Sequence, residues 1–124
     1  MDPSSLENGA IGVAAENGHE EIVKMLLQDP RVNPSAGHNS VIRSAARLGH
    51  TKIVKMLLDD PRVDPSANSN EALHAAGRMG SFETFEILLK DPRVLNSLSR
   101  SDIQQFMRTY QTCYPASYYY DDDD

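Results

Sequence analysis

The sequence repeats itself every 31 residues, and this period restricts the possible fold more than any other feature. Glycines stand at positions 18, 49 and 80, and prolines at positions 30, 61 and 92. The segments around them read ENGHEEIVKMLLQDPRVNPSA, RLGHTKIVKMLLDDPRVDPSA and RMGSFETFEILLKDPRVLNSL. A fixed period of this kind is typical of repeat architectures, in which stacked units bury a continuous core. The chain is therefore predicted to be a solenoid.

The phase of the repeat predicts the domain boundaries. Three units are expected at about residues 2–32, 33–63 and 64–94, here named unit one, unit two and unit three, and a half unit at 95–112 covers the last of them. Residues 1–112 then form one domain. Residues 113–124 end in four aspartates, and a block of like charge resists folding. We expect a disordered acidic tail there; the alternative is that the tail visits the binding groove and competes with a partner.

Each unit is predicted to hold two short helices, and unit two shows the pattern. Its first helix begins near Asn39, a residue type that caps helices well, and ends at Gly49, because glycine readily adopts positive φ. The second helix begins near Thr51 and ends before Pro61, since proline cannot continue the helical hydrogen bonds. Alanines line the first helix and paired leucines the second. The thin first helices are therefore expected on the concave side of a curved, all-α solenoid.

The second helix of each unit resembles the ankyrin repeat signature G-H-x-E-I-V-x-x-L-L. Residues 18–23 read GHEEIV, and residues 49–58 read GHTKIVKMLL. The Ala-Ala pairs of the first helices also match, and the L-H-x-A of residues 73–76 is similar to the end of the T-P-L-H-x-A motif. The likeness covers about residues 2–98. The D-P-R-V-D-P-S-A loop is similar to arrays of large DNA viruses and of amoeba-associated microbes.

Two departures from the ankyrin pattern bear on function. Ankyrin repeats usually run ~33 residues, and these units run 31. The Thr-Pro step is missing, and Gly12 and Arg43 replace the signature histidine of the first helix. The shortened loops predict tight turns in place of projecting β-hairpin fingers. The resemblance then implies that a partner is contacted mainly by the helical groove.

Charge and composition exclude several classes of function. The formal net charge is −6, but residues 1–120 carry 14 acidic and 12 basic side chains, so no nucleic-acid footprint is predicted. No apolar run approaches the ~20 residues that span a bilayer, and residues 1–5 lack the features of a secretory signal. Cys113 is the only cysteine. This favours an intracellular, cytoplasmic location, or the host cytoplasm if the protein is viral or an effector.

No residue pattern indicates catalysis, a cofactor or a metal. The glycine motifs of nucleotide-binding loops and of nucleophile elbows do not occur, and Cys113 has no histidine nearby in the sequence. His19 and His50 occupy the same position of adjacent units, so they are expected ~8–10 Å apart. This distance is too long for sharing an ion bound at ~2 Å. We predict that these histidines bond the turn between helices and that the protein is not an enzyme.

An Asp-Pro-Arg sequence recurs in every unit, which favours a structural role for its charged residues. Each aspartate is expected to pair with the arginine two residues later or to bond the next turn. The residues are Asp29, Asp60 and Asp91 with Arg31, Arg62 and Arg93.

Residues that vary between otherwise similar units are the candidates for partner binding. In ankyrin arrays the two residues after the Ala-Ala pair usually meet the partner, together with the loop tips. On this resemblance the predicted partner-binding residues are Glu16, Asn17, Arg43, Arg47, Leu48, His74, Arg78 and Met79. Their basic members would form a groove with apolar anchors, suited to an acidic peptide or helix. The alternative for this surface is an ordinary solvated face.

The predicted function is therefore that of a monomeric protein–protein interaction module. The alternative is a passive structural scaffold, a fragment or an engineered repeat array without a dedicated partner. The near-identity of unit one and unit two fits that alternative.

Overall fold

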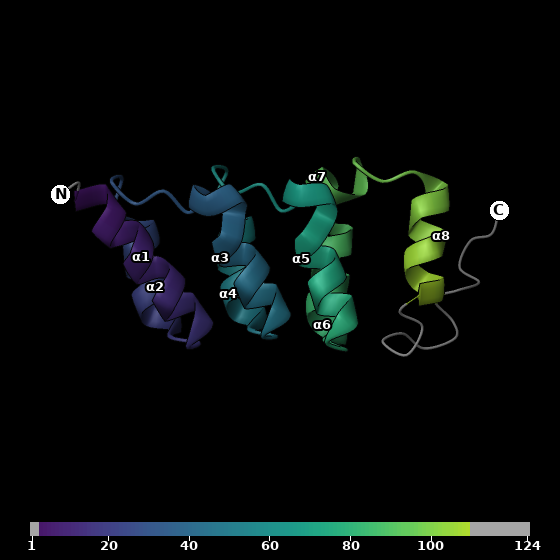
Figure 1. Cartoon of the computed structure of the whole chain (residues 1–124), viewed down its shortest axis with the longest axis horizontal. Coiled ribbons are helices and arrows are strands. Elements are labelled where there is room, and N and C mark those ends of the chain that lie inside the picture. The colour runs from purple at the N-terminus through teal and green to yellow at the C-terminus, as the bar shows by residue number, and fades with distance from the viewer. Residues whose placement is uncertain (1–2, 110–124) are drawn as a thin grey trace.

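The computed structural model describes residues 3–109, which form eight helices and contain no strand. The helices are α1 (Pro3–Glu16), α2 (Glu20–Leu27), α3 (Ala36–Arg47), α4 (Thr51–Leu58), α5 (Ala67–Arg78), α6 (Phe82–Lys90), α7 (Pro92–Leu95) and α8 (Arg100–Thr109). Figure 1 shows α1, α3 and α5 side by side in one row, which α8 continues, while α2, α4 and α6 lie behind them. The predicted all-α solenoid of helix pairs is confirmed. None of the described helices is both long and apolar enough to cross a membrane.

The recurring glycines end the first helix of each unit, as predicted. Gly18, Gly49 and Gly80 have φ values of 74°, 74° and 71°. In unit two the amide of Gly49 bonds the carbonyl of Ala46 at 3.2 Å, and the amide of His50 bonds that of Ala45 at 3.0 Å. These bonds satisfy the last carbonyls of the helix. The chain can therefore reverse direction within three residues.

Alanines and aliphatic residues make a single core that runs through all three units. Ala45 and Ala46 of α3 are fully buried, and so are Val54 and Leu57 of α4. The first helices contact one another more extensively than the second helices do. Small alanine side chains allow this close approach, which agrees with the thin row predicted from the sequence.

Asn39 does not cap its helix in the predicted way. It is the last residue of a left-handed turn, residues 37–39, which precedes the regular right-handed part of α3. Its side chain is buried, and its Oδ1 accepts a hydrogen bond of 2.8 Å from the amide of Asp64, in the loop of unit three. Asn70 has the same conformation, and its Nδ2 donates to Ser97 Oγ at 3.0 Å. Asparagine tolerates this backbone region better than most residues do. The hydrogen bonds of Asn39 and Asn70 show that this position joins units and does not cap a helix.

The third Asp-Pro-Arg sequence begins a helix, unlike the first two. Pro92 is in the first turn of the short helix α7, where its missing amide costs nothing. Asp91 caps this helix, because its side chain accepts a hydrogen bond from the amide of Arg93 at 2.9 Å. The predicted loop after unit three is therefore partly helical.

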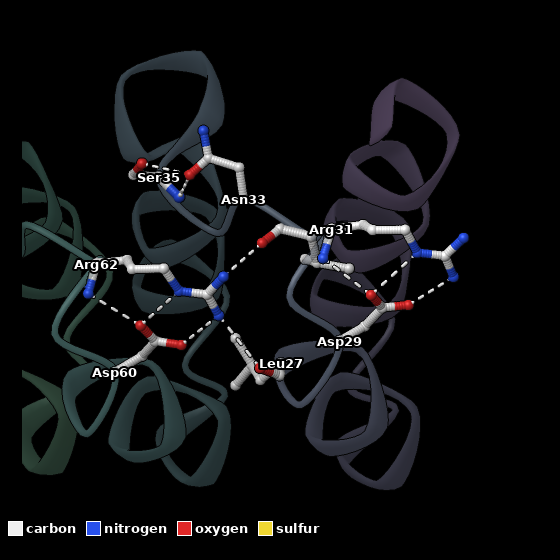
Figure 2. A network of polar contacts seen from close by, with 8 residues as sticks. Leu27, Asp29, Arg31, Asn33, Ser35, Asp60 and Arg62 are labelled. Atoms are coloured by element: carbon white, nitrogen blue, oxygen red, sulfur yellow. Dashed lines mark hydrogen bonds and ion pairs between the residues drawn. The ribbon is translucent and has the colours of Figure 1, made fainter. Parts of the chain in front are cut away.

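An aspartate–arginine pair holds each Asp-Pro-Arg loop, as one of the two predicted alternatives proposed. Asp29 pairs with Arg31 at 2.8 Å, Asp60 with Arg62 at 2.8 Å and Asp91 with Arg93 at 3.0 Å. Figure 2 shows the first two pairs, in which the carboxylate also accepts a hydrogen bond from the backbone amide of the arginine. Each guanidinium is thereby fixed in direction.

Two of these arginines also join one unit to the preceding unit. Arg62 donates from Nη1 to the carbonyl of Val32 at 2.6 Å and from Nη2 to that of Leu27 at 3.2 Å (Figure 2). Arg93 does the same to Val63 and Leu58, both at 2.7 Å. The recurrence of these arginines in every unit predicted a structural role. It did not predict that their side chains bond carbonyls of the preceding unit.

The ion pairs shift the titration of their carboxyl groups. The hydrogen bond from Arg31 lowers the pKa of Asp29 to about 2. The hydrogen bond from Arg62 likewise lowers the pKa of Asp60 and is the reason that the pKa of Arg62 is raised. Burial alone would raise the pKa of Asp91, but the hydrogen bonds from Arg93 outweigh it and the pKa is lowered. All three carboxyl groups therefore stay charged to lower pH than an isolated aspartate does.

Polar contacts also fix the register of the helices between units. His50 bonds the carbonyl of Glu16, at the end of α1, through Nε2 at 3.0 Å. It thus bonds the end of a first helix in the neighbouring unit, whereas the prediction was that it bonds the turn between helices. In the second row, Thr51 Oγ1 of α4 lies 2.8 Å from the buried Thr84 Oγ1 of α6. Unit two is therefore joined to unit one at the end of a first helix, and unit three is joined to unit two between second helices.

Helix α8 packs against unit three. Ser99 and Asp102 form a reciprocal cap: the amide of Asp102 donates to Ser99 Oγ, and the amide of Ser99 donates to Asp102 Oδ2, both at 3.0 Å. Ser99 therefore caps α8. Phe106 is buried, with its ring centroid 6.2 Å from that of Phe85. The side chain of Met107, Tyr110, Cys113 and the predicted tail lie outside the described part of the structure.

Candidate binding surface

The candidate residues gather on the surface formed by α1, α3 and α5 and their C-terminal ends, here named the first-helix face. Six of them lie at those ends, just before the turn glycines, and all six are exposed to solvent: Glu16, Asn17, Arg47, Leu48, Arg78 and Met79. Leu48 is 44% exposed and Met79 is 60% exposed. Apolar side chains with this much exposure are available for contact with another molecule.

A cavity of about 260 Å³ lies on this face between α3 and α5. Its lining consists of Ser40, Arg43, Ser44, Arg47, Glu71 and Ala75. Two of the predicted residues, Arg43 and Arg47, are thus brought together at one cavity. Leu48, Arg78, Met79, Glu16 and Asn17 are not part of its lining.

Arg43 is held in place by the left-handed turn at the start of its own helix. Its Nη2 donates to the carbonyl of Gly37 at 3.1 Å. Its Nε is buried and has no hydrogen-bond partner. Arg47 stands one turn further along α3 and is exposed. The cavity therefore has one anchored guanidinium and one that extends into solvent.

Glu71 is an acidic residue of the cavity that the sequence analysis did not single out. Glu71 has the position in unit three that Ser40 has in unit two. Its carboxylate pairs with Arg78 at 2.6 Å. Both side chains are more than one-third exposed, so the pair contributes little to stability. It does reduce the positive charge that was predicted for the groove at Arg78. The signal for Glu71 was its departure from the small residues at this phase in the other units.

His74 lies against the C-terminal helix and not in the cavity. Its ring centroid is 4.4 Å from that of Phe106 on α8, and its side chain is half-buried. Burial lowers its pKa; the neighbouring Glu71 acts in the opposite direction, and Arg78 adds to the lowering. His74 was predicted to lie in the groove with Arg43 and Arg47. In the structure it lies beside α8, and it does not line the cavity that holds these two arginines.

One further side chain of the face was not predicted, and one predicted side chain makes a structural contact with its backbone. Val13 of α1 is 60% exposed, at the phase of Ser44 in the next unit. Asn17 donates from Nδ2 to the carbonyl of Val13 at 3.0 Å and so caps the end of α1. The apolar contacts that this surface offers are therefore distributed over all three units, at Val13, Leu48 and Met79.

The described residues contain no group of three or more histidine, cysteine, aspartate or glutamate side chains placed to hold a metal ion. His50 bonds a carbonyl, and the repeated aspartates pair with arginines. His50 and the repeated aspartates thus have structural partners.

Two rows of paired helices, turned by glycines and joined by the same polar contacts in successive units, define a helical repeat protein. The family model for ankyrin repeats (3 copies) matches residues 10–97, and the chain belongs to the ankyrin repeat family. Ankyrin repeats are generally non-enzymatic modules of protein–protein interaction. No curated protein and no solved structure matches the chain.

Proposed function

We propose that this protein is a monomeric, intracellular interaction module that binds an acidic segment of a partner protein on the first-helix face. The observation that carries the proposal is the cavity between α3 and α5, where Arg43 and Arg47 lie together. The carboxylate of Glu71 at this cavity pairs with Arg78. Arg43 and Arg47 are therefore the cations of the cavity to which a partner's carboxylate would pair.

The geometry of Arg43 supports this choice. A guanidinium anchored by a backbone carbonyl loses less side-chain freedom when it binds a carboxylate, which favours affinity. Exposed apolar side chains at the C-terminal ends of α3 and α5, Leu48 and Met79, supply further contacts for a partner. The partner segment is therefore expected to carry acidic residues beside apolar ones.

A peptide-display selection against the full chain tests the proposal. Selected peptides should be acidic, and their binding should weaken as salt concentration rises. Changing Arg43 and Arg47 to glutamate should reduce their affinity roughly tenfold or more, the effect expected when a close charge pair is lost. The matched control is Lys52→Glu with Lys55→Glu, which makes the same charge change on exposed residues of α4. Equal losses in both variants, or no selected peptide, would favour the passive scaffold.

A further inference from the structure

The residues that α3 contributes to the cavity differ from those of unit one, although the buried residues of the two helices are the same. The cavity residues of α3 are Ser40, Arg43, Ser44 and Arg47, at whose phases unit one has Gly9, Gly12, Val13 and Glu16. The buried residues between them are Ile42, Ala45 and Ala46, which correspond to Ile11, Ala14 and Ala15. The polar groups of the cavity are therefore not part of the repeated scaffold.

Unit three shows what an arginine at one of these phases binds. Arg78 has the phase of Arg47, and Glu71 has the phase of Ser40. The guanidinium of Arg78 pairs with the carboxylate of Glu71 at 2.6 Å. In unit two a serine stands in place of that glutamate, and the exposed guanidinium of Arg47 has no acceptor among residues 3–109. Unit two therefore has the cation of this pair without its anion.

The cavity offers more donors to an anion than Arg78 offers to Glu71. Arg43 and Ser44 stand where unit three has a histidine and an alanine. The guanidinium of Arg43 bonds the carbonyl of Gly37 through one nitrogen, and its Nε has no partner. The hydroxyl of Ser44 has none among the described residues either. One bidentate guanidinium already pairs both oxygens of a carboxylate. The donors of this cavity therefore exceed what one carboxylate requires.

A phosphorylated side chain has the charge and the acceptors that match this set of donors. It carries about −1.5 to −2 charges at pH 7 and has three strong acceptor oxygens. Arginine forks bind such groups bidentately, and hydroxyl groups donate to the remaining oxygens. A phosphate therefore fits two guanidinium groups beside serine hydroxyls better than a carboxylate does.

The size of the cavity indicates a single group carried by a larger molecule. Its volume of about 260 Å³ lies below the ~300–1,000 Å³ of pockets that enclose whole small-molecule ligands. Leu48, 44% exposed at the end of α3, is available to apolar residues on either side of the bound group. A phosphate attached to a peptide segment satisfies both conditions.

Glu71 does not cancel the positive charge of the cavity. Its carboxylate is paired with Arg78, so it is already compensated. Arg43 and Arg47 then remain as uncompensated cations on the facing helix α3 (Figure 1). A dianion is therefore attracted to the α3 side of the cavity.

We propose that the cavity between α3 and α5 binds a phosphorylated side chain of the partner protein. This inference rests on the proposed function and specifies the anion that the cavity takes from the acidic segment. The guanidinium groups of Arg43 and Arg47 pair with the phosphate oxygens, and the hydroxyls of Ser40 and Ser44 donate to them. Binding by this protein would then depend on phosphorylation of its partner.

Three peptide pools with identical flanks test this choice of anion. The flanks are mixtures of alanine, aspartate and leucine, and the central residue is phosphoserine, glutamate or serine. Their affinities for the full chain are measured by fluorescence anisotropy at physiological salt. We expect the phosphoserine pool to bind about tenfold or more tightly than the glutamate pool. Inorganic phosphate and free phosphoserine, titrated as competitors, should bind much more weakly than the phosphoserine pool.

Ser40→Glu places in unit two the carboxylate that Glu71 supplies in unit three. It should pair with Arg47 and weaken binding of the phosphoserine pool about tenfold or more. The fold accepts glutamate at this phase, as unit three shows. The matched control is Val13→Glu, which adds the same charge to the first-helix face outside the cavity and should have little effect at physiological salt.

Ser44→Ala tests the hydroxyl separately. Alanine occupies this phase in unit three and favours helix, so the variant is expected to fold. Loss of one exposed hydrogen bond to a charged group should weaken the phosphoserine pool roughly fivefold and leave the glutamate pool unchanged. Thermal unfolding of each variant verifies that it is folded.

The possible outcomes separate this inference from the function on which it rests. Equal binding of the phosphoserine and glutamate pools, lost from both in Arg43→Glu with Arg47→Glu, would overturn the phosphate and retain the acidic segment. Absence of binding by either pool would overturn both. A preference for phosphoserine that persists in Ser40→Glu would show that the phosphate binds elsewhere. Equally tight binding of inorganic phosphate or free phosphoserine would show that the ligand is not a partner protein.

Discussion

The contribution of the arginine that joins unit three to unit two can be measured by its removal. In Arg93→Ala, the carbonyls of Val63 and Leu58 lose donors at 2.7 Å, and Asp91 loses its ion pair. Hydrogen bonds to a charged group contribute ~1.5–3 kcal/mol each. Two such bonds at the lower bound, appropriate for a side chain that is 36% exposed, give a loss of about 3 kcal/mol.

The matched variants are Arg62→Ala and Arg31→Ala. Arg62 makes the same two contacts, but one of them is longer, at 3.2 Å, so its loss should be about 2 kcal/mol. Arg31 is 60% exposed, and its ion pair with Asp29 lies within one loop. Its replacement should cost less than that of Arg62, because an exposed ion pair contributes little to stability.

Urea unfolding followed by circular dichroism measures all three, and comparable slopes with denaturant would show that the same transition is compared. The expected order of destabilisation is Arg93→Ala, then Arg62→Ala, then Arg31→Ala. Losses below about 1 kcal/mol for both Arg93→Ala and Arg62→Ala would refute the assignment of these two arginines as contacts between units.

Three other predictions concern single residues. Gly49→Ala should destabilise the protein by about 2 kcal/mol and Gly80→Ala by about 1 kcal/mol. Both glycines have positive φ, but only at Gly49 would the new Cβ lie close to another side chain, 3.1 Å from Ser81 Oγ. Comparable losses of the two variants in thermal unfolding would contradict this. Thr84→Val should cost about 1 kcal/mol in the same assay through loss of the bond to Thr51, and a stabilised variant would show that the bond contributes nothing. The folded-state pKa of His74 lies below 6.5, so its contribution to stability is present above pH 6.5 and is lost as pH falls. His74→Gln should therefore flatten the pH dependence of the free energy of unfolding between pH 7.5 and 5.5. An unchanged pH profile would contradict this prediction.

The sequence predicts the helix pairs well because the residues that form them act locally. The turn at Gly49 depends on one backbone conformation, and the pairing of Asp60 with Arg62 spans two residues. Contacts between units were harder to foresee. A repeat shows that His50 recurs at a fixed phase, but its partner depends on how far one unit is shifted along the next.

The start of the first helix was predicted wrongly for a related reason. Asparagine is a residue type that often caps helices. The side chain of Asn39 instead accepts a hydrogen bond from the amide of Asp64 in the loop of the next unit, and its backbone has a left-handed conformation. The choice between a local and a distant hydrogen bond depends on tertiary packing. Sequence spacing alone does not contain that information.

The candidate site was predictable in part. Arg43 and Arg47 lie at one cavity because α3 brings residues four apart to the same side. His74 was assigned to the same groove from its phase, and its contact with the ring of Phe106 depends on where α8 packs. Glu71 reduces the groove's charge, and only the geometry of its pair with Arg78 shows this.

Amide chemical shifts measured while a selected acidic peptide is titrated into the full chain test the central claim most directly. If the first-helix face binds the partner, the largest changes should fall on residues 40–48 and 71–79, and they should disappear in the Arg43→Glu, Arg47→Glu variant. Changes centred on Lys52 and Lys55 of α4, or changes that persist in that variant, would contradict the account.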